Sequence, residues 1–269
     1  MKNFEKLLYL LIKLSVITLL PSYLYLMVIE PLSSLDWGYT QRVWHSWQGF
    51  NVGMLAFLST CIIFLHTHNK SESQRRRELV ASLAFLPSAF VSVSDYLKDC
   101  VPTLEEAYER VMSGKRSELK RKLDSEPPDL PQTFQPAFKE CIRYAEDREG
   151  ELLSEVLRKL QIQNSRIKSL YEDEICETSK TYIDESTMRG HFDDVVYIKA
   201  LIDILYPYAR GGEIESPTVN RRIAGSALSS LKVSIKFQDA LREFMDNIYK
   251  GERYETTIFK RKGVKRTRG

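Results

Sequence analysis

The sequence predicts an all-α membrane protein, in which an N-terminal two-helix transmembrane hairpin is followed by a cytoplasmic helical bundle. Two apolar runs, about 7–29 and 45–66, are each long enough to cross a bilayer as a helix, which takes about 20 residues. The rest of the chain repeats apolar residues at helical spacings of three and four, and no run alternates as a strand would. We therefore expect a hairpin at 1–69, a helical domain at 70–250 and a C-terminal tail at 251–269.

The first apolar run contains one charge, Lys13, about two turns inside it. Its ammonium group can snorkel to the headgroups, or it can line a pore or meet a partner helix, because a charge in lipid is costly. Pro21 lies deeper and predicts a kink. Glu30-Pro31 follows the run without a small-x-small cleavage site, so we expect a retained anchor and not a signal peptide.

The second apolar run carries small residues along one helical face. The members of this small-residue stripe are Gly49, Gly53, Ala56 and Thr60. Small residues let two helix backbones approach closely in lipid. The stripe therefore predicts a helix-packing surface. Its partner is either the hydroxyl-bearing face of the first run, opposite Lys13, or the same stripe in another copy of the chain.

Basic residues near the two runs predict the orientation in the membrane. Positive charges flank the start of the first run and the exit of the second, whereas the connection contains only Arg42. Lys and Arg favour the cytoplasmic side, so both termini are expected there, in a bacterial inner membrane. All three tryptophans fall in or beside the connection, at positions 37, 44 and 47. They predict an aromatic belt at the outer interface.

We expect the part of the chain after the second apolar run to form a bundle of four to six helices. The segment 78–97 is too rich in serine for a third span, and Pro87 should break it. Thr103-x-x-Glu106 has the pattern of a capping box that starts a helix reaching about Met112. Three prolines make 126–132 a loop.

Four further helical segments complete the predicted bundle. A helix over 134–148 should end at Gly150. The longest amphipathic run, 151–188, is one helix or two with a break near 163–165, and Gly190 should end it. The segments 193–206 and 219–249 follow, the latter as a final long helix.

The sequence offers no catalytic pattern. It has no phosphate-binding loop, no GxGxxG, no GxSxG and no HExxH motif. Its four cysteines are scattered, which fits a reducing compartment, and its four histidines are too dispersed for a metal site. His191 follows Gly190 and is expected at the surface of a helix start. The sequence therefore predicts no enzyme, no cofactor, no metal and no small-molecule substrate.

The C-terminal tail is strongly basic. The last ten residues hold six basic residues and no acid, although the whole chain has a net charge of only +3. The six are Lys260, Arg261, Lys262, Lys265, Arg266 and Arg268. They can contact anionic lipid or nucleic-acid phosphates, or simply aid solubility. The tail has no aromatic residue from Lys260 on, so stacking on bases is not indicated.

Four stretches carry a resemblance to a loose group of bacterial membrane proteins with two N-terminal spans and a helical cytoplasmic domain. These stretches are 47–49 (WQG), 75–96 (RRRELVASLAFLPSAFVSVSDY), 160–170 (LQIQNSRIKSL) and 204–210 (ILYPYAR). The layout also resembles the two-span effector of certain anti-phage retrons. In those systems a reverse transcriptase and its RNA–DNA hybrid hold the effector inactive until infection.

The resemblance implies a toxin-like membrane effector of antiviral defence that causes abortive infection. Such a protein would contact inner-membrane lipid, form homo-oligomers and meet a reverse transcriptase with its RNA–DNA hybrid. The alternative is a non-enzymatic membrane scaffold or regulatory protein whose helical domain binds another protein. No catalytic motif is implied by the resemblance.

Overall fold

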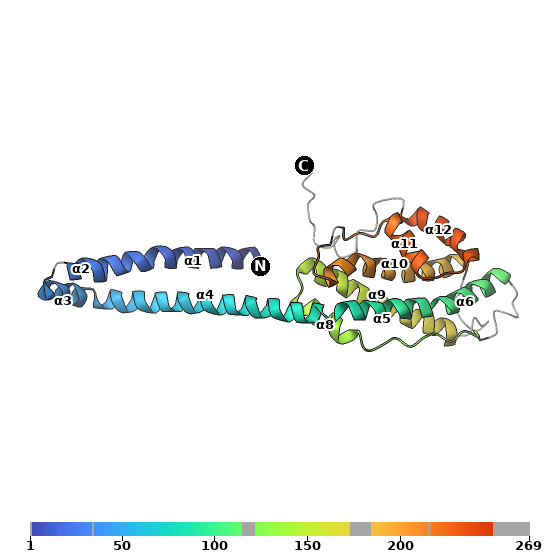
Figure 1. Cartoon of the computed structure of the whole chain (residues 1–269), viewed down its shortest axis with the longest axis horizontal. Coiled ribbons are helices and arrows are strands. Elements are labelled where there is room, and N and C mark those ends of the chain that lie inside the picture. Colours follow the sequence, from blue (N-terminus) through green and yellow to red (C-terminus); the bar gives the residue numbers. More distant parts are fainter. Residues whose placement is uncertain (1, 34, 115–121, 173–183, 215, 250–269) are drawn as a thin grey trace. The chain divides into compact units, whose positions relative to one another are not determined.

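The computed structural model describes residues 2–33, 35–114, 122–172, 184–214 and 216–249 (Figure 1). Every regular element in these ranges is a helix, which confirms the all-α prediction. The chain divides into two compact units, 1–77 and 78–269, and each is considered by itself.

The first unit begins with a nearly continuous helical run. Helix α1 spans Lys2–Leu24, a π-helical turn η1 spans Tyr25–Ile29, and α2 spans Glu30–Ser33. Pro21 lies inside α1, where it supplies no N–H to the helical ladder. The chain remains helical through Pro21 and widens into the π turn one turn later. There the Glu30 N–H donates to the Tyr25 carbonyl.

A short helix, α3 (Trp37–Ser46), forms the connection in the first unit. The Asp36 carboxylate caps it by accepting hydrogen bonds from the N–H groups of Gly38 (2.9 Å) and Tyr39 (3.2 Å). The following helix, α4, spans Gln48–Leu83. Residues 45 and 46, which we assigned to the second apolar run, therefore belong to α3. The two compact units divide after Arg77, inside α4, and the predicted hairpin boundary at residue 69 also falls within this helix.

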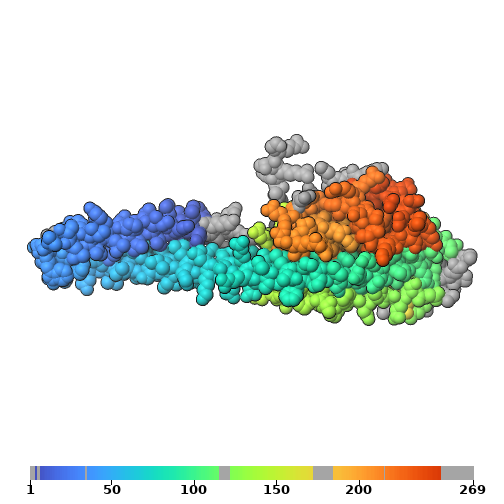
Figure 2. Space-filling model, in the orientation of Figure 1, coloured from blue at the N-terminus to red at the C-terminus, as the bar shows by residue number. Residues whose placement is uncertain are grey.

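Helices α1 and α4 lie beside each other in the first unit (Figures 1 and 2). Leu58 and Cys61, one turn apart on α4, are its buried side chains. The apolar segments that begin at Leu7 and at Gln48 are long and apolar enough to cross a membrane, judged by length and composition. This agrees with the prediction of two membrane-spanning helices.

The second unit is a helical domain that packs around α10 (Figure 1). Its helices are α5 (Leu86–Asp99), α6 (Val101–Ser113), α8 (Gln135–Tyr144), α9 (Asp147–Glu172), α10 (Glu185–Ala209), α11 (Arg221–Ser230) and α12 (Ile235–Tyr249). Helices α5, α6, α9, α11 and α12 all contact α10. Residues 195–202 of α10 are buried without exception, so this helix forms the centre of the core.

Helix α5 is a core helix of this domain. Phe90, Val93 and Leu97 are fully buried along one of its faces, and Phe90 meets Phe138 of α8 edge to face at 5.7 Å. The break predicted at Pro87 is present, because α4 ends at Leu83 and Pro87 lies in the first turn of α5.

The predicted capping box is wrong. Helix α6 begins at Val101, and Thr103 and Glu106 lie inside it. The Thr103 hydroxyl donates to the Ser125 carbonyl (3.3 Å). The Glu106 carboxylate accepts the N–H groups of Asp124 (2.8 Å) and Ser125 (2.7 Å). The two side chains hold the following segment against α6 instead of starting a helix.

Several predicted helix ends are also wrong. Helix α8 ends before Ala145, whose backbone is extended, and Gly150 lies inside α9. Gly190, which was expected to end a helix, lies inside α10. Of the two alternatives for the segment around 163–165, the unbroken one holds, because α9 passes through it. The segment 219–249 forms two helices and not one, because the chain turns between α11 and α12, where Lys232 has a φ of 59°.

Candidate functional site

The small-residue stripe lies on the face of α4 that points away from α1. At 100° per residue its four members fall roughly 160–220° around the helix from the buried Leu58. A Cβ atom added at Gly49 or Gly53 would meet no atom within 4 Å, and Ala56 and Thr60 are exposed. The first span is therefore not the partner of the stripe within this chain. A second copy remains the predicted partner.

The hydroxyl-bearing face of α1 is satisfied by its own helix. Ser15 donates to the Ile12 carbonyl (2.8 Å), and Ser22 donates to the Thr18 carbonyl (2.8 Å). Thr18 donates in turn to the carbonyl of Leu14 at 3.0 Å. These bonds remove the need for a polar partner, which matters because lipid offers none.

Polar side chains join α1 to α4 at two levels. The Tyr23 hydroxyl donates to the Asn51 amide oxygen at 3.3 Å, and the Tyr9 hydroxyl donates to the Asn69 amide oxygen at 3.1 Å. The Tyr9 ring also lies 4.7 Å from the ring of His68. Sequence reasoning missed Asn51, although an amide inside an apolar run was a visible signal. These contacts set which faces of the two helices meet.

The aromatic residues of the connection form an ordered cluster. The Trp44 indole N–H donates to the Met27 carbonyl at 2.7 Å. Its ring meets Trp37 edge to face at 6.1 Å, and Trp47 meets Phe50 in the same way at 5.6 Å. These three indoles remain 39–60% exposed. Partly exposed amphipathic rings with a satisfied N–H suit a membrane–water interface.

Lys13 is exposed on α1 and makes no hydrogen bond or ion pair with any residue that the structure describes. It is the one charged residue of the predicted first span. Among the described residues of the first unit, no side chain compensates the charge of Lys13.

The remaining predicted binding residues lie outside the described part of the chain. This holds for the basic tail and its six cationic residues, Lys260, Arg261, Lys262, Lys265, Arg266 and Arg268. It also holds for Cys176. The prediction that the tail contacts lipid or nucleic acid stays a prediction.

The thiols of the helical domain are poor nucleophiles. Burial raises the pKa of Cys100 to about 12 and that of Cys141 to about 11, so both stay protonated near neutral pH. Among the described residues, no three histidine, cysteine, aspartate or glutamate side chains gather as a metal site would require. His191 was expected at a helix start but lies inside α10, where burial lowers its pKa.

Two carboxylates are buried in the domain without a charged partner in direct contact. The Tyr249 hydroxyl donates to Asp193 at 2.9 Å, and the Tyr197 hydroxyl donates to Glu155 at 3.0 Å. Burial raises the pKa of Asp193 to about 6, against the opposing hydrogen bond from Tyr249. Because Tyr249 is the last residue of α12, this bond ties the end of that helix to α10.

Comparisons with protein family models, with curated proteins and with solved structures find no match for this chain. No activity, substrate or partner is therefore transferred from a relative. The features that bear on function are the two apolar helices, the open stripe on α4 and the unpaired Lys13.

Proposed function

We propose that this chain is a membrane-embedded effector, without enzymatic activity, of a bacterial anti-phage system of the retron type. Its apolar helices form a transmembrane hairpin in the inner membrane with both termini in the cytoplasm. When a cytoplasmic partner releases the helical bundle, copies assemble and perturb the membrane, which aborts the infection. The open stripe on α4 is the observation that carries this proposal.

The position of the stripe favours assembly between copies. Helix association in lipid depends on close packing, because lipid tails are as apolar as leucine side chains. Gly49 and Gly53 have open space above their Cα atoms, so a second helix can approach α4 there. Since α1 occupies the opposite face, assembly does not require the two helices of one chain to separate.

The uncompensated charge of Lys13 favours the same assembly. A lysine inside a span costs about 3 kcal/mol or more unless it meets water or a partner. Lys13 is exposed on α1 and has no ion-pair or hydrogen-bond partner among the described residues. A water-filled interface between copies would solvate the ammonium group, and ions could cross the membrane through the same interface.

The partner is assigned from the resemblance and from the charge of the tail. A reverse transcriptase with its RNA–DNA hybrid would present phosphates, and the six cationic residues of the tail can contact these without a fold of their own. Removing 260–269 should weaken that link, and the link should weaken steeply with salt.

The test is the membrane potential, reported by a dye, in cells that express the chain without its genomic neighbours. The wild type should collapse the potential, and Gly53→Ile should preserve it. A Cβ atom added at position 53 has no atom of a neighbouring element within 4 Å, so a loss of toxicity with Gly53→Ile would report on contacts between copies. The matched control is Leu55→Ile, which changes an exposed residue off the stripe.

Three results would contradict the proposal. An intact potential with the unrestrained wild type would favour the scaffold alternative. Equal effects of Gly53→Ile and Leu55→Ile would show that the stripe does not seat a helix. Unchanged toxicity of Lys13→Leu at matched expression would show that Lys13 only snorkels.

The orientation needs its own test, because an inverted hairpin would place the bundle on the wrong side. Reporters that are active only in the periplasm are fused at Ser34 and after Gly269. We expect activity at Ser34 alone. Activity after Gly269 with none at Ser34 would contradict the orientation.

A further inference from the structure

The central helix of the domain carries a lysine in its most buried segment. Lys199 interrupts the apolar run 195–202 of α10, and only 8% of its surface is exposed. Its ammonium group pairs with Asp203 one turn later. The lysine end of this pair is buried, whereas the Asp203 side chain keeps 35% of its surface exposed.

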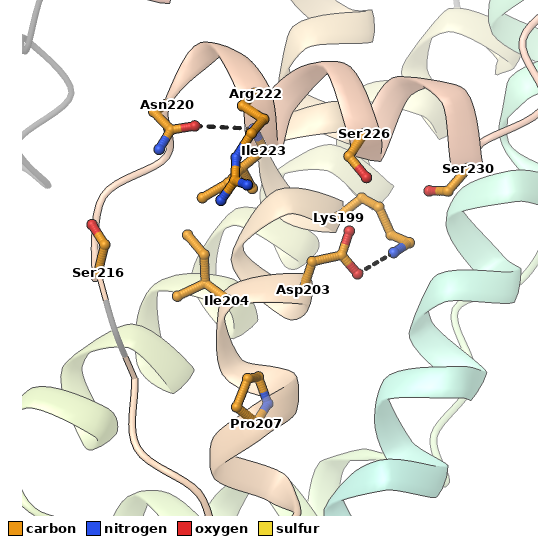
Figure 3. A pocket seen from close by; sticks show the side chains of 10 residues that line it. All are labelled: Lys199, Asp203, Ile204, Pro207, Ser216, Asn220, Arg222, Ile223, Ser226 and Ser230. Atoms are coloured by element: carbon orange, nitrogen blue, oxygen red, sulfur yellow. Dashed lines mark hydrogen bonds and ion pairs between the residues drawn. The ribbon is translucent and has the colours of Figure 1, made fainter.

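The pair opens into a cavity between α10 and α11 with a volume of about 540 Å³ (Figure 3). This volume lies within the range of about 300–1,000 Å³ typical of small-molecule sites. Lys199, Asp203 and Pro207 recur every fourth residue and line the α10 side. The α11 side presents Arg222, Ile223, Ser226 and Ser230, which recur at helical spacing.

One end of the cavity holds both hydrogen-bond donors and hydrogen-bond acceptors. Lys199 has three N–H donors and gives one to Asp203, which leaves two. The Ser226 hydroxyl has no partner among the described residues, and Ser230 donates to the Ala227 carbonyl (2.7 Å) with its oxygen free to accept. Figure 3 shows both serines on the side of α11 nearest Lys199. Clustered donors and acceptors of this kind suit the hydroxyl groups of a polyol.

The other end of the cavity is cationic. Arg222 makes no hydrogen bond or ion pair with any described residue, so its five donors are available. Ile204 lines the cavity on the α10 side, next to Asp203 in the chain (Figure 3). A guanidinium with free donors matches the oxygen geometry of a phosphate. Lys199 and Arg222 outweigh Asp203, so the described residues that line the cavity carry a net charge of +1.

We propose that this cavity binds a small phosphate ester of a polyhydroxyl compound. Its phosphate meets Arg222, and its hydroxyl groups meet Lys199, Asp203 and Ser226. None of the residues described as lining the cavity is aromatic, so a stacked nucleobase is not favoured. The ligand is a free sugar phosphate or the glycerol phosphate headgroup of a lipid. This site does not depend on the proposed effector function.

The test is calorimetric titration of the full chain in phosphatidylcholine nanodiscs with ribose 5-phosphate, sn-glycerol 3-phosphate, inorganic phosphate and ribose. We expect saturable binding of the two esters, with the phosphate and the sugar each at least about tenfold weaker. Phosphatidylglycerol added to the nanodiscs will compete with the free ester if the natural ligand is a lipid headgroup. It will not compete if the natural ligand is a free sugar phosphate.

Three variants locate the ligand. Arg222→Ala should weaken ester binding at least about tenfold. Arg221→Ala, which removes the same charge from the neighbouring position, should change it less than twofold, because Arg221 pairs with Asp246 outside the cavity. Asp203→Asn should weaken binding of the esters and leave that of inorganic phosphate unchanged, with thermal unfolding as the check on folding.

Each contrary result overturns a stated part of the proposal. If the wild type binds none of the four probes, or if Arg222→Ala binds the esters as the wild type does, the cavity is not the proposed phosphate-ester site. If inorganic phosphate binds as tightly as ribose 5-phosphate, the cavity does not recognise the hydroxyl groups of the ester.

Discussion

The two units are both helical, yet they place their apolar side chains oppositely. In the first unit, large apolar residues of α1 and α4 such as Leu10, Ile17 and Ile63 are 58–65% exposed. In the second unit, Phe90, Leu160 and Leu201 are fully buried. The second arrangement removes its apolar side chains from water, whereas the first leaves apolar surface that lipid or another helix could cover.

The units also differ in how they satisfy polar groups. The hydroxyls of α1 bond to carbonyls of their own helix, as lipid requires. The domain instead joins separate elements through buried polar pairs, such as Tyr197 with Glu155 and Tyr249 with Asp193. Loss of a polar side chain should therefore cost more in the domain than in the first unit.

The largest expected contrast comes from the same truncation in each unit. Phe138→Ala should destabilise the domain by about 3–5 kcal/mol, because the ring is fully buried between Phe90 and Phe134. Phe57→Ala, at a ring that is 47% exposed, should leave domain unfolding unchanged. Urea unfolding of the full chain in mild detergent, followed by circular dichroism, measures both. If both variants lowered the free energy of unfolding equally, the two units would not differ in how much their buried side chains stabilise the fold.

The next contrast removes an arginine from each unit. Arg110→Met should cost the domain about 3 kcal/mol, because it leaves the largely buried Glu106 without its cation and frees the Lys122 carbonyl, which Arg110 bonds at 2.9 Å. Arg75→Met breaks an exposed pair with Glu72 and should cost less than about 1 kcal/mol. The same urea titrations compare the variants. If Arg110→Met lowers the free energy of unfolding by less than about 1 kcal/mol, Arg110 does not hold the segment 122–125 against α6.

Hydropathy and periodicity predicted what each unit is made of, but not where its helices end. Gly150 and Gly190 were taken as helix ends, yet both lie inside helices. A glycine inside a helix costs only about 1 kcal/mol, and the burial of α9 and α10 in the core outweighs it. An added Cβ at Gly150 would lie 3.5 Å from the Ile142 carbonyl oxygen, which is an ordinary van der Waals contact, so packing does not require a glycine there.

Side-chain partners were harder to predict than helices. Thr103 and Glu106 have capping-box spacing, but their partners lie some twenty residues later in the chain, which no local pattern reveals. The stripe on α4 was visible from spacing, whereas its orientation away from α1 depends on how the two helices meet. Lys199 gave a signal that was missed, namely a single charge inside the apolar run 195–202.

A smaller effect depends on pH. Because burial raises the pKa of Asp193 from 3.8 to about 6, the folded domain holds this proton more tightly than the unfolded chain. The stability from this group is fully present below about pH 4 and is lost as the pH rises through about 6. The loss is roughly 2–3 kcal/mol.

Asp193→Asn removes this pH dependence. The amide can still accept from the Tyr249 hydroxyl but cannot ionise. Asp194 and Lys159 also act on Asp193 with opposite signs, and both remain in the variant. The variant should be more stable than the wild type at pH 7 and nearly equal to it at pH 4, by urea unfolding at each pH. Parallel pH profiles for the two proteins would contradict a raised pKa.

The smallest expected effect tests the first unit itself. Tyr23→Phe removes the hydroxyl that donates to Asn51, so α1 and α4 lose a polar contact while their apolar surfaces stay the same. Hydrogen bonds between helices in membranes contribute about 0.6 kcal/mol on average, since the separated helices also find partners. A double-mutant cycle of Tyr23→Phe with Asn51→Leu should therefore give a coupling energy below about 1 kcal/mol.

Tryptophan fluorescence measures this coupling without interference from the domain. All three tryptophans of the chain lie between residues 37 and 47, so their emission in a dodecyl sulfate titration reports on the first unit alone. The control is Tyr25→Phe, since the Tyr25 side chain is 57% exposed and makes no hydrogen bond with the described residues. A coupling above about 2 kcal/mol would mean that a buried polar pair holds the first unit as firmly as the domain, and the contrast between the units would then fail. Zero coupling would mean that the apolar contacts around Leu58 and Cys61 alone keep α1 on α4.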